Sequence, residues 1–121
     1  MTPMGQPLVA VVDDDPRIRE LLAGELEELR AEVLRCGSGA ELLSQPRLAE
    51  VRLVLLDWML PERHGGQVLE ALRRTAFPGR VVVVSALCDP EMRRQAIAGG
   101  AAAILLKTEA LEQLPQLLSR V

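Results

Sequence analysis

The stretch LVAVVDDDP, residues 8–16, joins an apolar run to three consecutive carboxylates. The run is rich in β-branched residues and apolar throughout, which predicts a strand that is buried on both faces. Asp15 followed by Pro16 is a usual start for a helix, with Asp at the N-cap and Pro in the first helical position. Asp13 and Asp14 lack such a structural reason, and neighbouring acids repel by about 4 kcal/mol at an effective dielectric near 20. We therefore expect these two residues to serve a function.

Strand-like and helix-like segments alternate along the rest of the chain. Apolar or weakly alternating runs predict further strands at residues 32–36, 53–56, 80–84 and 102–106. Helical spacing predicts helices at residues 17–30 and around residues 68–72, and a last helix from the fifth strand to Val121. Capping signals predict two more. One runs from Ser38 to about Leu48 with a capping box to Glu41, and the other from Asp89-Pro90 to Gly99-Gly100. A loop with Pro61, Gly65 and Gly66 joins the predicted strand at residues 53–56 to the helix around residues 68–72. This alternation indicates an open α/β sandwich with a five-stranded parallel sheet.

Length and composition restrict the class of protein further. The 121 residues suit one domain over 1–121, and apolar residues make up 49% although only Trp58 and Phe77 are aromatic, so we expect an aliphatic core. A net charge of −3 argues against direct nucleic-acid binding by this chain. Residues 1–7 do not resemble a signal peptide, and no run approaches a membrane span of about 20 apolar residues. We expect a cytoplasmic domain in which Cys36 and Cys88 are free thiols.

The residues that follow the predicted strands carry the chemistry. In open parallel sheets, ligands bind outside the carboxyl ends of the strands, near the point where the strand order reverses. The residues at or just after these ends are Asp13, Asp14, Asp57, Ser85, Ala86 and Lys107. We therefore expect three acids, a hydroxyl and a lysine to converge on one edge of the sheet.

A cluster of three carboxylates is unfavourable unless a hard cation lies within it, and Mg²⁺ prefers oxygen ligands of this kind. With the metal present, one carboxylate can act as a nucleophile toward phosphorus. Ser85 and Lys107 would then bind phosphoryl oxygens, one as a hydroxyl donor and the other as a positive charge. The chain contains neither a P-loop nor a dinucleotide-binding fingerprint, and DDDP would repel a flavin phosphate.

VVDDDP, LVLLDWMLPERHGG, VVVVSAL and ILLKT, in this order and spacing, resemble the receiver domain of bacterial two-component response regulators. The resemblance covers essentially the whole chain and implies a flavodoxin-like sheet in the order 2-1-3-4-5. It implies that Asp57 accepts a phosphoryl group from a sensor histidine kinase. Asp14 would bind Mg²⁺ directly, Asp13 largely through water, and Met59 through its backbone carbonyl. The string DWMLP resembles the winged-helix transcription factors in particular.

The resemblance also assigns the remaining site residues and the partners. Ser85 matches the switch hydroxyl, Lys107 matches the site lysine, and the amide of Ala86 would contact the phosphoryl group. It implies a switch module rather than an enzyme, with a homodimer face formed by the fourth helix, fifth strand and fifth helix. Two alternatives stay open. One is a pseudo-receiver that binds partners without phosphorylation, and the other is an aspartyl-phosphate phosphohydrolase, which Met59 disfavours because such enzymes usually carry Asp there.

Three positions depart from the family pattern. Thr108 follows Lys107 where family members often have a proline with a cis bond, so the geometry of this peptide is left open. Ile104 replaces the usual aromatic switch residue. Pro115 lies near the start of the last predicted helix, and a proline deeper in a helix clashes with the carbonyl four residues back, so we expect this helix to begin late or irregularly.

Overall fold

The computed structural model describes residues 6–60 and 64–121. Five parallel strands form one sheet in the order β2-β1-β3-β4-β5, as predicted. The strands are β1 (Leu8–Val12), β2 (Glu32–Cys36), β3 (Leu53–Asp57), β4 (Arg80–Ser85) and β5 (Ala103–Leu106). Part of the loop predicted around Pro61 lies outside the described residues. The central position of β1, β3 and β4 explains why their runs are apolar throughout, since both of their faces are covered.

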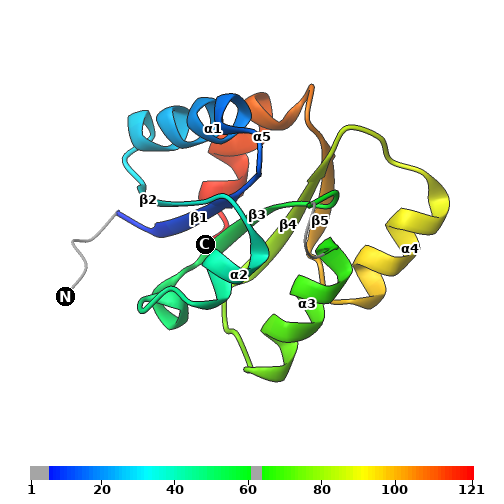
Figure 1. Cartoon of the computed structure of the whole chain (residues 1–121). Coiled ribbons are helices and arrows are strands. Elements are labelled where there is room, and N and C mark those ends of the chain that lie inside the picture. The colour runs from blue at the N-terminus through cyan, green and yellow to red at the C-terminus, as the bar shows by residue number, and fades with distance from the viewer. Residues whose placement is uncertain (1–5, 61–63) are drawn as a thin grey trace.

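Helices cover both faces of the sheet (Figure 1). One face carries α1 (Pro16–Glu28) and α5 (Ala110–Leu118), and the other carries α2 (Gly39–Leu43), α3 (Gly65–Arg74) and α4 (Pro90–Ala98). A short 3₁₀ helix, η1 (Leu48–Glu50), precedes β3. This arrangement is a doubly wound three-layer sandwich, and it places the carboxyl ends of all five strands along one edge.

Two aliphatic cores lie on opposite sides of the sheet. Successive residues of β3 alternate between them, so that Leu53 and Leu55 pack beneath α1 and α5, whereas Val54 and Leu56 face the other three helices. Trp58 is the one aromatic residue among the buried core residues that the structure describes. Each buried Val or Leu side chain contributes about 1.5–3 kcal/mol relative to exposure. The expected aliphatic core is therefore confirmed.

The predicted N-caps form, but α2 is much shorter than expected, and α5 ends at Leu118 rather than at Val121. Asp15 accepts a hydrogen bond from the amide of Arg17 at 2.9 Å, and Asp89 accepts one from the amide of Met92 at 2.8 Å. The prediction of a helix from Ser38 to about Leu48 is wrong, because α2 ends at Leu43. Pro46 explains the early end, since a proline disfavours helical geometry in the residue before it.

Ser38 caps α2 as expected, accepting a hydrogen bond from the amide of Glu41 at 3.1 Å. The second half of the predicted capping box is different. The side chain of Glu41 accepts from the amide of Gly37 at 2.8 Å, one residue before the N-cap. The Glu41 side chain therefore satisfies the amide of Gly37 in place of the N-cap amide that a capping box would use.

The last helix begins at Ala110, after a turn over residues 107–109 and without a side-chain cap. This late start agrees with the expectation, and Pro115 is accommodated inside the helix. Pro115 has no N–H, so it cannot donate to the carbonyl of Leu111 one turn earlier. The Lys107–Thr108 peptide is trans. Within the described residues, no helix is long and apolar enough to cross a membrane.

Candidate functional site

The three predicted acids meet at the carboxyl edge of the sheet. β1 and β3 are neighbours with Val12 opposite Leu56, so Asp13 and Asp57 lie at adjacent strand ends. Carboxylate oxygens of Asp13, Asp14 and Asp57 all lie within 4.8 Å of one another. Asp13 and Asp57 are 2% and 3% exposed, whereas Asp14 faces solvent. The cluster is therefore a half-open acidic site, with two acids beneath a third that water can reach.

Lys107 enters this cluster from β5, two strands away from β3. Its backbone amide donates to the carbonyl of Ser85 at 2.8 Å, which fixes the start of the loop after β5. Its Nζ lies 3.1 Å from Asp13 Oδ2 and 3.4 Å from Asp57 Oδ2. The ammonium group therefore bridges the two buried carboxylates, a contact with Asp13 that the sequence did not predict.

Burial and charge act on the ionisation of these groups in opposite directions. Burial raises the pKa of Asp57, and the nearby charge of Asp13 raises it further. The hydrogen bond from the Met59 amide and the charge of Lys107 lower it, but the net shift is upward. Burial alone would lower the pKa of Lys107, but its contacts with Asp13 and Asp57 outweigh this and raise it. Lys107 is therefore a cation at neutral pH, and it offsets part of the repulsion among the acids.

Backbone amides orient the two buried carboxylates. Asp57 Oδ1 accepts from the amide of Met59 at 3.1 Å, and Asp13 Oδ1 accepts from the amide of Asp15 at 2.9 Å. Arg19 adds a contact that sequence reasoning missed, because its Nη1 donates to the backbone carbonyl of Asp13 at 3.0 Å. The sequence contains one sign of this contact, since Arg19 lies one turn into the helix that follows the acids.

The remaining predicted site residues lie along the same edge but are less tightly joined to the acids. Ser85 is buried at the end of β4, and its Oγ accepts from the amide of Leu87 at 3.4 Å. Within the described residues, no hydrogen bond joins the Ser85 hydroxyl to Asp57. Ala86 and Met59 are exposed in the loops that follow β4 and β3. The structure thus brings together Asp13, Asp14, Asp57 and Lys107, with the others at the rim.

The donor set fits a hard divalent cation. Three carboxylates supply the oxygen ligands that Mg²⁺ prefers, and the exposure of Asp14 leaves room for the water molecules that Mg²⁺ usually retains. A bound cation would also relieve the repulsion among the three acids, which the single ammonium of Lys107 only partly offsets.

Trp58, directly after β3, and His64, directly before α3, pack against each other. Trp58 is buried, and its ring meets that of His64 edge to face with centroids 4.6 Å apart. His64 is exposed, and its Nδ1 accepts from the amide of Gly66 at 3.1 Å, so it caps α3. Gly65 is required here, because a Cβ would lie 2.8 Å from the Trp58 ring. His64 thus has a structural role.

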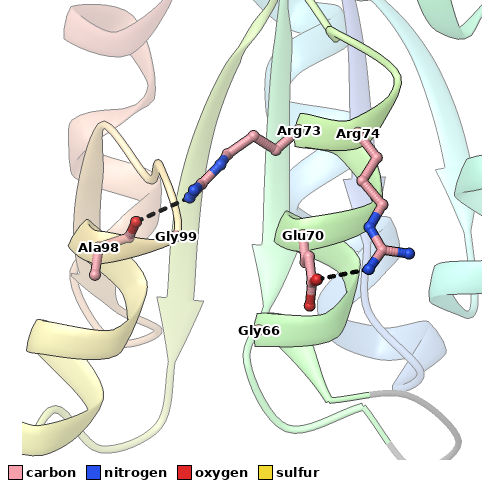
Figure 2. A pocket seen from close by; sticks show the side chains of 6 residues that line it. All are labelled: Gly66, Glu70, Arg73, Arg74, Ala98 and Gly99. Carbon is pink, nitrogen blue, oxygen red and sulfur yellow. Dashed lines mark hydrogen bonds and ion pairs between the residues drawn. The ribbon is translucent and has the colours of Figure 1, made fainter.

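A groove of about 530 Å³ runs between α3 and α4, away from the acids. Figure 2 shows that its two arginines already have partners: Arg73 reaches across to the carbonyl of Ala98 at 3.1 Å, and Arg74 folds back onto Glu70 at 3.0 Å. Its lining contains none of the predicted site residues. Cys36 is a buried and Cys88 an exposed free thiol, as expected.

Together, the fold and the site define a doubly wound α/β domain with a carboxylate–lysine site at its strand ends. The family model of the response regulator receiver domain matches residues 9–119. The chain belongs to this family, and the predicted resemblance is confirmed.

Curated relatives include the transcriptional activator protein PfeR of Pseudomonas aeruginosa, 38% identical over 89% of this chain and 35% of the relative. The probable transcriptional regulatory protein NarL of Mycobacterium tuberculosis is 35% identical over 82% of this chain and 47% of the relative. The chain spans about a third to a half of the length of the curated relatives that it matches first.

Solved structures agree with this assignment. The signal receiver domain of the putative response regulator NarL from M. tuberculosis has a TM-score of 0.82 and 31% identity, covering 94% of this chain and 97% of that domain. Thermotoga maritima TrrA, solved in complex with Mg²⁺ and BeF, has a TM-score of 0.82 and 26% identity, covering 95% of this chain and 98% of that one.

Proposed function

We propose that this chain is a phosphorylation-controlled switch in which Asp57 accepts a phosphoryl group from a sensor histidine kinase. The position of Asp57 carries the proposal: its carboxylate is buried at the end of β3, beside Asp13 and the ammonium of Lys107. Family membership supports it, because receiver domains are phosphorylated on Asp by histidine kinases. We assign Asp13, Asp14, Asp57 and the backbone carbonyl of Met59 as the residues that would hold Mg²⁺.

In the transfer, one carboxylate oxygen of Asp57 forms a bond to phosphorus while the bond between phosphorus and the donor imidazole nitrogen breaks, and the imidazole takes up a proton from solvent. Lys107 already lies beside the nucleophile, so it can move from the carboxylates to the phosphoryl oxygens. The Ser85 hydroxyl and the Ala86 amide would donate to these oxygens as well. Mg²⁺, when bound, neutralises charge on the phosphoryl group and the carboxylates.

The consequence of phosphorylation would be a change of partner surface. In the family, an aromatic switch residue usually moves together with the switch hydroxyl. Here its position is taken by the aliphatic side chain of Ile104, which lies in the core at 9% exposure.

We propose a homodimer through the face of α4, β5 and α5. We also propose a cytoplasmic location and a transcriptional output, with any DNA contact made outside this chain. The named relatives are transcriptional regulators, which supports this output.

The test is labelling with acetyl phosphate, a small donor that needs no kinase, followed by intact-mass spectrometry. We expect one added phosphoryl group with Mg²⁺ and none with excess chelator. Asp57→Asn should remain unlabelled, whereas Asp89→Asn, which changes an acid at the N-cap of α4, should label as the wild type does. Equal labelling of Asp57→Asn would refute the assignment.

A further inference from the structure

Arg19 connects α1 to the loop that carries the acids. Its Nη1 donates to the backbone carbonyl of Asp13 at 3.0 Å. The guanidinium also lies against the chain at the end of β2, where a Cβ on Gly37 would be 3.3 Å from the same nitrogen. Among residues 6–60 and 64–121, Arg19 forms no ion pair. Its hydrogen bonding is thus directed at the backbone beside the acid cluster rather than at an acidic side chain.

Asp13 is held at four atoms. Its amide donates to the carbonyl of Cys36 at 3.0 Å, and its carbonyl accepts from Arg19. Its carboxylate accepts from the amide of Asp15 at 2.9 Å through one oxygen and lies 3.1 Å from Lys107 Nζ through the other. The next residue in the chain is Asp14, the exposed acid of the cluster. Arg19 therefore holds the peptide group from which the carboxylate of Asp14 projects.

We propose that Arg19 is a positioning residue for the divalent cation site. It fixes the backbone between Asp13 and Asp14, so that both carboxylates stay aimed at one point. Removing it would let this loop relax and spread the ligands apart. The inference rests on the proposed Mg²⁺ site. Residues that orient metal ligands typically change affinity by about 10- to 100-fold when they are replaced.

The sign of the effect separates this role from simple electrostatics. A positive charge near a cation site repels the cation, so removing that charge should tighten Mg²⁺ binding. Loss of positioning should weaken it. Arg17 provides the matched control, because it also lies in the first turn of α1, but its side chain is 90% exposed and pairs with Asp15 instead of contacting Asp13.

The experiment is a Mg²⁺ titration followed by the fluorescence of Trp58, which is the only tryptophan and directly follows Asp57. We expect Arg19→Gln to raise the Kd for Mg²⁺ about tenfold or more. Arg17→Gln should leave the Kd unchanged or slightly lower. Arg19→Lys, which keeps the charge and one donor, should lie between the wild type and Arg19→Gln. Binding by Arg19→Gln as tight as that of Arg17→Gln would overturn the inference.

A second variant leaves Arg19 itself intact. Gly37→Val places methyl groups where the guanidinium lies, and should displace it from Asp13. We expect a Kd raised at least threefold, and an unchanged Kd would contradict the proposal even if Arg19→Gln does not fold. A wild-type protein that binds no Mg²⁺ at millimolar concentration would overturn the proposed metal site, and this inference with it. Binding by the wild type together with equal binding by the variants would overturn the role of Arg19 alone.

Discussion

The ammonium nitrogen of Lys107 lies 3.4 Å from Asp57 Oδ2, although the two residues are 50 positions apart in the chain. β4 lies between β3 and β5 and pairs with both, so only one strand separates the carboxyl end of β3 from that of β5. The same ammonium lies 3.1 Å from Asp13, so one cation serves two buried carboxylates. The folded protein thus encloses more negative than positive charge at this edge of the sheet.

Lys107→Met should lower the free energy of unfolding by about 3 kcal/mol in buffer with chelator, since two buried carboxylates would lose their cation. This is the low end of the range for a buried pair, because the Lys107 side chain is 23% exposed. Urea denaturation measures this. The control is Arg74→Met, which breaks the pair with Glu70 between side chains that are 78% and 64% exposed. Exposed pairs contribute about 0–1 kcal/mol. Equal losses in the two variants would show that the pairing at the site has no special weight.

Asp14→Ala should raise stability in metal-free buffer by up to about 1 kcal/mol, because it removes one of three clustered like charges. It should also abolish the stabilisation that Mg²⁺ gives to the wild type. Thermal melts with and without Mg²⁺ test both effects. Glu28→Ala, which removes an exposed acid at the end of α1, should change neither. A variant clearly less stable than the wild type in chelator would refute the repulsion argument.

The buried thiol of Cys36 should make stability depend on pH in alkali. Burial raises the pKa of Cys36 from 9.0 to about 11, and the charge of Glu41 adds to the effect. The folded state therefore holds this proton more tightly than the unfolded chain does. The resulting stability is complete below about pH 9 and is lost as the pH rises through 11, by about 2–3 kcal/mol for two pKa units.

The measurement compares unfolding free energies at pH 8 and at high pH. Cys36→Val lacks this titration, so its stability should fall less steeply than that of the wild type between these values. Cys88→Ser changes the exposed cysteine and should keep the wild-type pH dependence. Parallel curves for the wild type and Cys36→Val would mean that the thiol does not titrate as its burial implies.

The phosphorylated form should decay over many minutes or longer. Hydrolysis needs a water molecule aligned with the Asp57–phosphorus bond. The side chains flanking it in the family correspond to Met59 and Leu87, which are 67% and 79% exposed and offer no group to orient water. Groups that position or activate such a water contribute about 10²- to 10⁴-fold, so their absence should be measurable.

Loss of label at neutral pH with Mg²⁺ gives the half-life. The double variant Met59→Asn/Leu87→Glu should decay faster than the wild type, whereas Leu21→Glu, an exposed apolar residue on α1, should not. A wild-type half-life of seconds, or no acceleration in the double variant, would contradict this prediction.

The strand ends could be predicted from the sequence because each central strand is an apolar run that stops at a polar residue. β1 has the predicted bounds, and Asp57 and Ser85 are the last residues of β3 and β4. Parallel pairing then places these residues on one edge without any knowledge of side-chain packing. The doubled Gly99-Gly100 likewise marked the end of α4, where Gly100 adopts a φ of 106°.

The contacts within the site were less accessible. The bond from Arg19 to the Asp13 carbonyl depends on how α1 lies against β1, and the bridge from Lys107 to Asp13 spans the edge of the sheet from the end of β5 to the end of β1; no local pattern encodes either contact. The end of α2 was missed for a different reason. The capping signal of Ser38 and Glu41 marks only where this helix begins, whereas Pro46 decides where it ends.

The identity of the phosphorylated residue decides whether Asp57 is the phosphoryl acceptor. The protein would be labelled with acetyl phosphate and Mg²⁺, treated with borohydride, which reduces an aspartyl phosphate to homoserine, and then sequenced by peptide mass spectrometry. We expect homoserine at position 57 and unmodified Asp at positions 13 and 14. Homoserine at position 13 or 14, or no homoserine in labelled protein, would contradict it.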